Sequence, residues 1–131
     1  MSRNKFITEI DINASKKMLF PYLRSVSGLS QWVADDVTID EDKVYNFIWD
    51  GEDHKAKLAA YKLNDFVRFE FLPEEGEEEG DNAYFEFKLR QSELTQSVSI
   101  QVTDYTDEED DEELEDMWYS LIGALKETVG G

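Results

Sequence analysis

The sequence contains few residues whose type and spacing could support acid–base or nucleophilic chemistry. His54 is the only histidine and there is no cysteine, which excludes disulfides, thiolate metal sites and thiol nucleophiles. His54 follows the turn-forming pair Asp50-Gly51 among charged neighbours, which predicts a solvent-exposed side chain with a structural role. Arg68 and Glu70 lie two residues apart on one face of a strand; they either line a polar cavity or form surface cross-strand pairs, and we favour the surface pairs. Because no nucleophile elbow, phosphate loop or dinucleotide fingerprint is present, we expect a non-enzymatic protein with no cofactor.

Acidic residues outnumber basic ones and lie mainly in two tracts. The chain of 131 residues has 31 Asp and Glu against 13 Lys and Arg, which gives a net charge of −18. The first tract, about residues 73–82, has the Gly and Pro punctuation of an exposed hairpin loop. The second tract, about residues 104–113, forms the entrance to a C-terminal helix. This charge argues against nucleic acid or an anionic membrane as a partner, and it favours a monomer.

The two tracts also raise the question of a cation site or a partner surface. Calcium prefers several oxygen ligands, but the second tract lacks the central glycine and spaced ligands of an EF-hand loop, so we expect no structured metal site. An exposed acidic surface can instead attract a basic protein partner, or simply keep the protein in solution. The lack of cysteine, of a signal peptide and of an apolar stretch of about 18 residues predicts a cytoplasmic protein with no membrane span.

Hydrophobic periodicity predicts an α+β fold. A first strand over residues 5–12 precedes two short helices, and the first helix is expected to end at Gly28. About six strands then follow in sequence, as in an antiparallel meander, with Asp50-Gly51 as a tight hairpin turn. In the strand over residues 97–103 the apolar side chains face inward, and the Ser, Gln and Thr side chains face outward.

The last predicted element is a long amphipathic helix over about residues 112–129. Its apolar residues recur every three or four positions, so they form one buried stripe. Its N-cap is expected to be Thr106 together with Glu109, or Asp107. Since it is the only element long enough to cover the apolar face of the meander, we predict a curved antiparallel sheet of six to seven strands around this helix.

This element order and several short segments resemble the START-like (SRPBCC) superfamily, whose members have the helix-grip fold. Within it, the chain is similar to the Aha-type branch, named for an activator of the heat-shock chaperone ATPase, and to small stand-alone bacterial START-like proteins. The resemblance covers about residues 4–129 and is specific for the fold rather than for an activity. It rests on Ile12-Asn13-Ala14-Ser15, Gly28-Leu29-Ser30-Gln31-Trp32, Phe47, Trp49-Asp50-Gly51 and the C-terminal helix with Trp118, Leu121 and Leu125.

The resemblance implies a groove or cavity between the long helix and the concave face of the sheet. The side chains that would form its walls are assigned from apolar content alone. Two interpretations stay open for them: they line a pocket for a hydrophobic ligand, or they fill a tightly packed core. The candidate wall residues are Trp32, Tyr45, Phe47, Trp49, Phe69, Phe71, Phe85, Phe87, Trp118, Leu121, Ile122 and Leu125.

We expect residues 1–131 to form a single START-like domain. Three hypotheses for its function follow. The leading one is a non-enzymatic protein that holds a small hydrophobic or lipid-like ligand beneath the helix, with Trp and Tyr edges fixing its orientation. The second is a protein-interaction or chaperone-associated module that acts through its acidic surface. The third is a cyclase-like enzyme that uses Arg68 and Glu70, because the superfamily includes cyclases.

Overall fold

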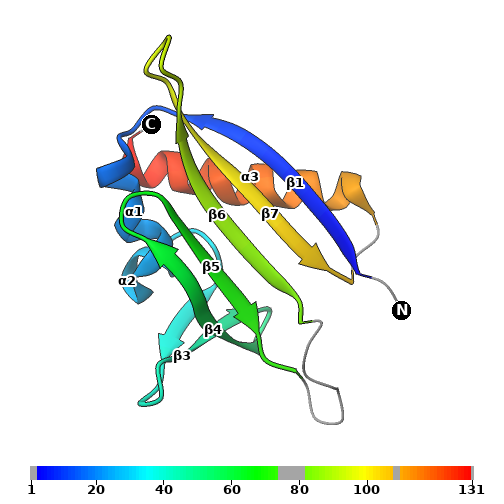
Figure 1. Cartoon of the computed structure of the whole chain (residues 1–131). Helices are drawn as coiled ribbons and strands as arrows, with labels where there is room; N and C mark the ends of the chain where they lie inside the picture. Colours follow the sequence, from blue (N-terminus) through cyan, green and yellow to red (C-terminus); the bar gives the residue numbers. More distant parts are fainter. Residues whose placement is uncertain (1–2, 74–81, 108–109, 131) are drawn as a thin grey trace.

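The structure, a computed structural model, describes residues 3–73, 82–107 and 110–130. The hairpin loop predicted for residues 73–82 lies almost entirely outside these ranges, as does Glu109. The described residues form one curved, antiparallel, seven-stranded sheet in the order β1-β7-β6-β5-β4-β3-β2, together with three helices (Figure 1). The elements in chain order are β1 (Asn4–Ile12), α1 (Lys16–Arg24), α2 (Val26–Leu29), β2 (Asp36–Ile39), β3 (Val44–Trp49), β4 (Glu52–Lys62), β5 (Phe66–Phe71), β6 (Tyr84–Gln91), β7 (Val98–Thr106) and α3 (Asp111–Val129).

The sheet consists of a six-stranded meander, β2 to β7, with the first strand, β1, added at the edge next to β7. Strands β2 to β7 pair with their neighbours in sequence, as the alternating pattern predicts. Strand β1 then pairs with β7 along its whole length, from Asn4 opposite Thr106 to Ile12 opposite Val98. The tight turn between β3 and β4 is confirmed, since Asp50 and Gly51 have φ values of 53° and 78°, the left-handed backbone of a two-residue hairpin.

Helix α3 lies across one face of the sheet, behind β1, β6 and β7 in the view of Figure 1, with α1 beside its C-terminal end. Its apolar stripe is buried against the sheet, as the three- and four-residue spacing predicts. The predicted N-caps are wrong. Strand β7 continues to Thr106, and the cap is Asp110, whose Oδ1 accepts hydrogen bonds from the backbone N–H groups of Glu112 (3.0 Å) and Glu113 (3.3 Å).

The sequence predicts that the first helix ends at Gly28, and this is wrong. The corner between α1 and α2 explains the difference. Helix α1 ends at Arg24, because Ser25 has extended backbone and its side chain caps α2 by accepting from the Gly28 N–H (3.0 Å). Gly28 lies inside α2, where the two helices approach closely. An added Cβ there would lie 2.4 Å from the Pro21 carbonyl oxygen and 2.6 Å from the Tyr22 Cα, so only glycine fits.

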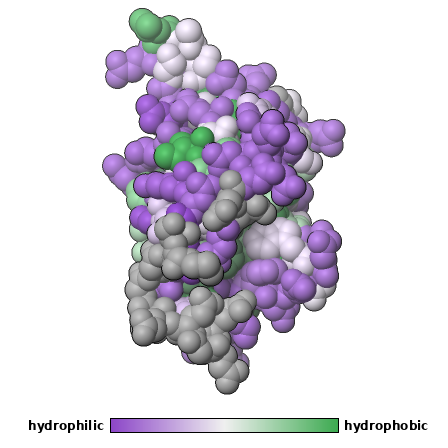
Figure 2. Space-filling model, turned by 90° about the vertical axis from the view of Figure 1, so that its right-hand side faces the viewer, coloured by the Kyte–Doolittle hydropathy of each residue, from purple (hydrophilic) through white to green (hydrophobic). Residues whose placement is uncertain are grey.

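The core lies between the concave face of the sheet and the helices, and the opposite face is mostly polar. Two outward side chains depart from the predicted exposure: Ser99 and Thr103 are only 6% and 7% exposed. Strand β7 lies between β1 and β6, so both residues are flanked by a paired strand on each side, and the Ser99 hydroxyl donates to Glu9 Oε2 at 2.7 Å. Figure 2 shows one side of the surface, where hydrophilic residues dominate and hydrophobic ones form small, separate areas.

Candidate ligand cavity

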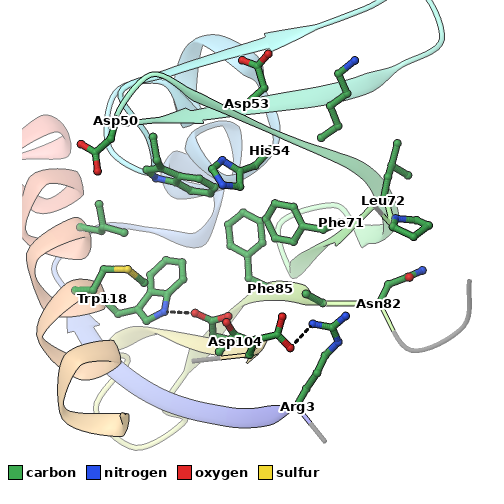
Figure 3. A pocket seen from close by; sticks show the side chains of 18 residues that line it. Arg3, Asp50, Asp53, His54, Phe71, Leu72, Asn82, Phe85, Asp104 and Trp118 are labelled. Atoms are coloured by element: carbon green, nitrogen blue, oxygen red, sulfur yellow. Dashed lines mark hydrogen bonds and ion pairs between the residues drawn. The ribbon is translucent and has the colours of Figure 1, made fainter. Parts of the chain in front are cut away.

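A cavity of about 760 Å³ opens between the first half of α3 and the end of the sheet that carries the β3–β4 turn (Figure 3). Strand curvature separates the sheet from the helix at this end. The walls of the cavity come from six separate segments of the chain. The residues that line it are Arg3, Trp49, Asp50, Asp53, His54, Lys55, Phe71, Leu72, Pro73, Asn82, Ala83, Phe85, Asp104, Thr106, Asp107, Met117, Trp118 and Leu121.

Aromatic rings form much of the apolar wall. Phe71 and Phe85 stack with centroids 5.3 Å apart and planes 14° from parallel, and Phe85 also contacts Trp118 at 5.9 Å. Trp49 is fixed by a hydrogen bond from its Nε1 to the Val33 carbonyl oxygen (2.8 Å). Because these rings are held by packing and a hydrogen bond, the cavity has an ordered wall before any ligand enters.

The structure divides the twelve predicted wall residues into two groups. Five line the cavity: Trp49, Phe71, Phe85, Trp118 and Leu121. The other seven are at most 4% exposed and pack together beside it, which corresponds to the packed-core interpretation for this part of the fold. They are Trp32, Tyr45, Phe47, Phe69, Phe87, Ile122 and Leu125.

Two of the packed residues use their polar atoms to join the sheet to α1. The Trp32 Nε1 donates to the Tyr22 carbonyl oxygen (2.8 Å), and the Tyr45 hydroxyl donates to the Arg24 carbonyl oxygen (3.1 Å). Burial raises the pKa of Tyr45, and the positive charge of Arg24 opposes this rise. Both aromatic side chains therefore have a structural role, since their hydrogen-bonding groups are used within the fold.

Asp104 places a carboxylate on the inner side of the sheet, at the cavity. It lies on β7 opposite Phe85 of β6, and its Oδ2 accepts a hydrogen bond from the Trp118 Nε1 at 2.9 Å (Figure 3). Burial raises the pKa of Asp104 above the ordinary aspartate value, and the Trp118 hydrogen bond partly opposes this. The sequence contained a signal for this position, because Asp104 continues the inward set Val98, Ile100 and Val102 at a spacing of two.

His54 also lies on the cavity wall, and its predicted exposure to solvent is wrong. It is half-buried and stands opposite Phe47 in the β3–β4 register, so its side chain shares the inner face of the sheet. Its ring meets the Trp49 indole edge to face at 5.1 Å. The His54 Nδ1 is buried and has no hydrogen-bond partner among the described residues. Strand parity could have placed His54, but the charges beside the turn indicated exposure instead.

Arg68 and Glu70 lie on the face of β5 that points away from the cavity. The Arg68 guanidinium stacks 3.7 Å from the ring centroid of Tyr84, and Glu70 accepts a hydrogen bond from the Asn82 amide at 3.0 Å. Neither residue lines the cavity. The interpretation that this pair lines a polar cavity is therefore wrong. Both side chains make contacts on the outer face of the sheet, where the partner of Arg68 is an aromatic ring and not a carboxylate.

Within residues 3–73, 82–107 and 110–130, no group of three or more His, Asp or Glu side chains is placed to hold a metal ion. None of the helices in the same ranges is both long and apolar enough to cross a bilayer.

A curved antiparallel sheet around one long C-terminal helix, with a cavity between them, is the helix-grip fold. The chain belongs to the START-like superfamily, because the family model for the START-like superfamily domain matches residues 1–131. The resemblance seen in the sequence is thereby confirmed. A comparison with curated proteins found no match.

Several solved structures are similar to this chain. BfR322 from Bacteroides fragilis is 32% identical, with 98% of this chain and 92% of that one covered and a TM-score of 0.61. The Aha1 dimer from Colwellia psychrerythraea is 18% identical, with 96% of both chains covered and a TM-score of 0.73. ChR145 from Cytophaga hutchinsonii is 15% identical, with 99% of this chain and 96% of that one covered and a TM-score of 0.72. At such low identity, the second and third similarities show the shared fold alone.

Proposed function

We propose that this protein binds a small hydrophobic molecule in the cavity between α3 and the sheet, without catalysing a reaction. The observation that carries the proposal is the cavity itself, whose volume of about 760 Å³ falls within the range of known ligand pockets, roughly 300–1,000 Å³. Ring faces of Trp49, Phe71, Phe85 and Trp118 line it, so a bound apolar molecule would leave water for an aromatic surface.

The contacts of Asp104 and His54, two titratable groups at the cavity, support the non-enzymatic part of this proposal. The Asp104 carboxylate is bound to an indole N–H, and the His54 ring packs against an indole. Neither contact joins a nucleophile to a base, which is the arrangement that covalent or acid–base catalysis uses. The residues that motivated the cyclase hypothesis, Arg68 and Glu70, lie on the other side of the sheet.

The test is native mass spectrometry of the protein purified from its own host, followed by solvent extraction and identification of bound molecules. We expect a co-purified apolar compound. Leu121→Trp places a large ring in the cavity and should abolish the bound mass. Tyr119→Trp changes a neighbouring residue of α3 that is exposed and does not line the cavity, so it should retain the ligand. If no apolar molecule is extracted and an apolar compound library leaves the NMR spectrum unchanged, the proposal is refuted.

A second function, as a module that binds a basic protein surface, has support from the exposed acids at the start of α3. Asp107, Asp111, Glu112 and Glu113 are all exposed. The last three lie in the first turn of α3, where negative charge interacts favourably with the helix dipole. Co-purification with a basic partner that weakens with salt, and that is lost when residues 107–113 are neutralised, would support this function. A partner that binds equally well after neutralisation would remove its basis.

A further inference from the structure

The cavity has a polar side with an excess of negative charge. Among the described residues that line it, four are aspartates, whereas the cationic ones are Arg3 and Lys55. The Arg3 guanidinium donates to Asp107 Oδ1 at 2.7 Å, so this cation is already engaged by a carboxylate. A ligand that enters the cavity therefore meets a wall with more carboxylate than cationic groups.

Asp104 is the carboxylate placed deepest in this wall. Within the described parts of the chain, its only hydrogen-bond partner is the Trp118 Nε1, whereas an ionised carboxylate can accept about four hydrogen bonds. It has no ion-pair partner among these residues. Burial raises its pKa, which means that the charged form is poorly solvated in the folded protein. A ligand that supplies a hydrogen-bond donor with a positive charge would provide both the missing hydrogen bonds and the missing ion pair.

The aromatic rings next to Asp104 suit a positive charge as well as an apolar surface. Trp118 is bonded to Asp104, Phe85 stands opposite Asp104 on the neighbouring strand, and Phe71 stacks on Phe85. Trp118 meets Asp104 with its N–H edge, so Phe85 and Phe71 are the rings available to attract an ammonium group over their faces, at a distance within about 6 Å. Figure 3 shows Asp104 and Trp118 on one wall and His54 on the opposite wall. Phe85 and Phe71 lie between these two walls.

We propose that the cavity selects apolar amines, whose ammonium group is held by Asp104 beside Trp118 and Phe85 while the apolar part lies along Phe71 and Trp49. This inference rests on the ligand-binding function proposed above and narrows its ligand class. A fatty acid or another apolar anion is disfavoured, because its carboxylate would meet the Asp104 carboxylate at the polar side of the cavity.

The test compares three probes of nearly equal size that differ in charge: 1-naphthylmethylamine, 1-naphthylmethanol and 1-naphthoate. Each is titrated at neutral pH into ¹⁵N-labelled protein, and the Trp118 and Trp49 indole N–H signals report on the cavity. We expect the amine to bind about tenfold more tightly than the alcohol, since a charged hydrogen bond replaces a neutral one, and the naphthoate to bind most weakly. The shifts should be largest at Trp118.

Two variants with the same change in net charge separate a specific anchor from general attraction to an acidic protein. Asp104→Asn keeps an oxygen that can accept from Trp118 but removes the charge, so the preference for the amine over the alcohol should disappear. Asp42→Asn removes a carboxylate from an exposed position that does not line the cavity, and it should leave the preference intact. Asp104→Thr, which suits a β-strand, serves as a second variant in case the amide substitution perturbs the fold.

Each result has a distinct meaning. The amine assignment is overturned if the three probes bind equally, or if the preference persists in both Asp104 variants; in either case the cavity still binds apolar molecules. If no probe shifts the two indole signals, the amine assignment fails; the proposed ligand-binding function fails with it when the solvent extract and the compound library are also negative. An amine preference that is lost in the Asp104 variants and kept in Asp42→Asn establishes the proposal.

Discussion

Two glycines in helices allow one substitution to be tested in opposite structural settings. At Gly28 in α2, an added Cβ would lie 2.4 Å from the Pro21 carbonyl oxygen and 2.6 Å from the Tyr22 Cα. Both are backbone atoms, so they cannot rotate away, and the α1–α2 corner has to separate. At Gly123 in the interior of α3, the same added Cβ would have no described atom within 4 Å other than those of its chain neighbours and the adjoining backbone of its own helix. We therefore expect Gly28→Ala to destabilise the protein and Gly123→Ala to stabilise it.

The magnitudes follow from these contacts. Overpacking costs roughly 1–3 kcal/mol, and a clash with two backbone atoms belongs at the upper end of that range. Alanine also restricts the unfolded chain, which stabilises the folded state by about 0.4–1 kcal/mol. The free energy of unfolding of Gly28→Ala should therefore fall by about 2 kcal/mol in total. For Gly123→Ala there is no clash, so we expect a gain of about 0.5–1 kcal/mol, the usual difference between alanine and glycine inside a helix.

Guanidinium unfolding followed by circular dichroism measures both free energies, and thermal unfolding should show Tm moving in opposite directions. For a domain of this size, about 2 kcal/mol corresponds to a fall in Tm of roughly 6–10 °C. An unchanged m-value would confirm that the variants alter stability rather than the extent of unfolding. The reasoning is refuted if Gly28→Ala is neutral or stabilising, or if Gly123→Ala is as destabilising as Gly28→Ala.

Further predictions concern the buried carboxylate and the helix cap. Because burial raises the folded-state pKa of Asp104, its contribution to stability is fully present below its unfolded pKa of about 4 and is lost as the pH rises through the folded pKa. The unfolding free energy of Asp104→Asn relative to wild type should therefore increase with pH over this window, and a pH-independent difference would contradict the assignment. Trp118→Phe removes the N–H that partly opposes this shift, so the pKa of Asp104, measured by NMR titration of its carboxyl carbon, should rise further. The lost hydrogen bond and ring volume should also lower the unfolding free energy by about 3 kcal/mol in a guanidinium titration. Asp110→Ala should lower it by about 1 kcal/mol through loss of the α3 cap, whereas Asp110→Asn, which can still cap, should stay close to wild type.

The sequence predicted most of the secondary structure and the antiparallel meander because both depend on local patterns. Alternating apolar residues in the strand over residues 97–103 indicated the inner face correctly, and the φ values at Asp50 and Gly51 bear out the hairpin turn. The apolar stripe beginning at Leu114 identified the one helix able to cover the sheet. Each of these features is specified by residues only a few positions apart in the chain.

Features that depend on contacts between distant segments were predicted less well. Gly28 was read as a helix end, whereas the close approach of α1 decides its role. The cap of α3 was placed at Thr106 or Asp107, but the pairing of β7 with β1 extends the strand to Thr106 and moves the cap to Asp110. His54 was assigned to solvent from its charged neighbours, although its pairing opposite Phe47 turns it inward.

The sequence by itself determined that an aromatic inner face of a sheet would meet an amphipathic helix, because periodicity fixes which side chains share a face. Only the tertiary structure decided how much of the intervening space those side chains fill. Phe47, Phe69 and Phe87 are fully buried and help fill it. Near the β3–β4 turn the sheet curves away from the helix, and a cavity with Asp104 on its wall remains. Packing density depends on the separation of elements far apart in the chain, and no local pattern encodes that separation.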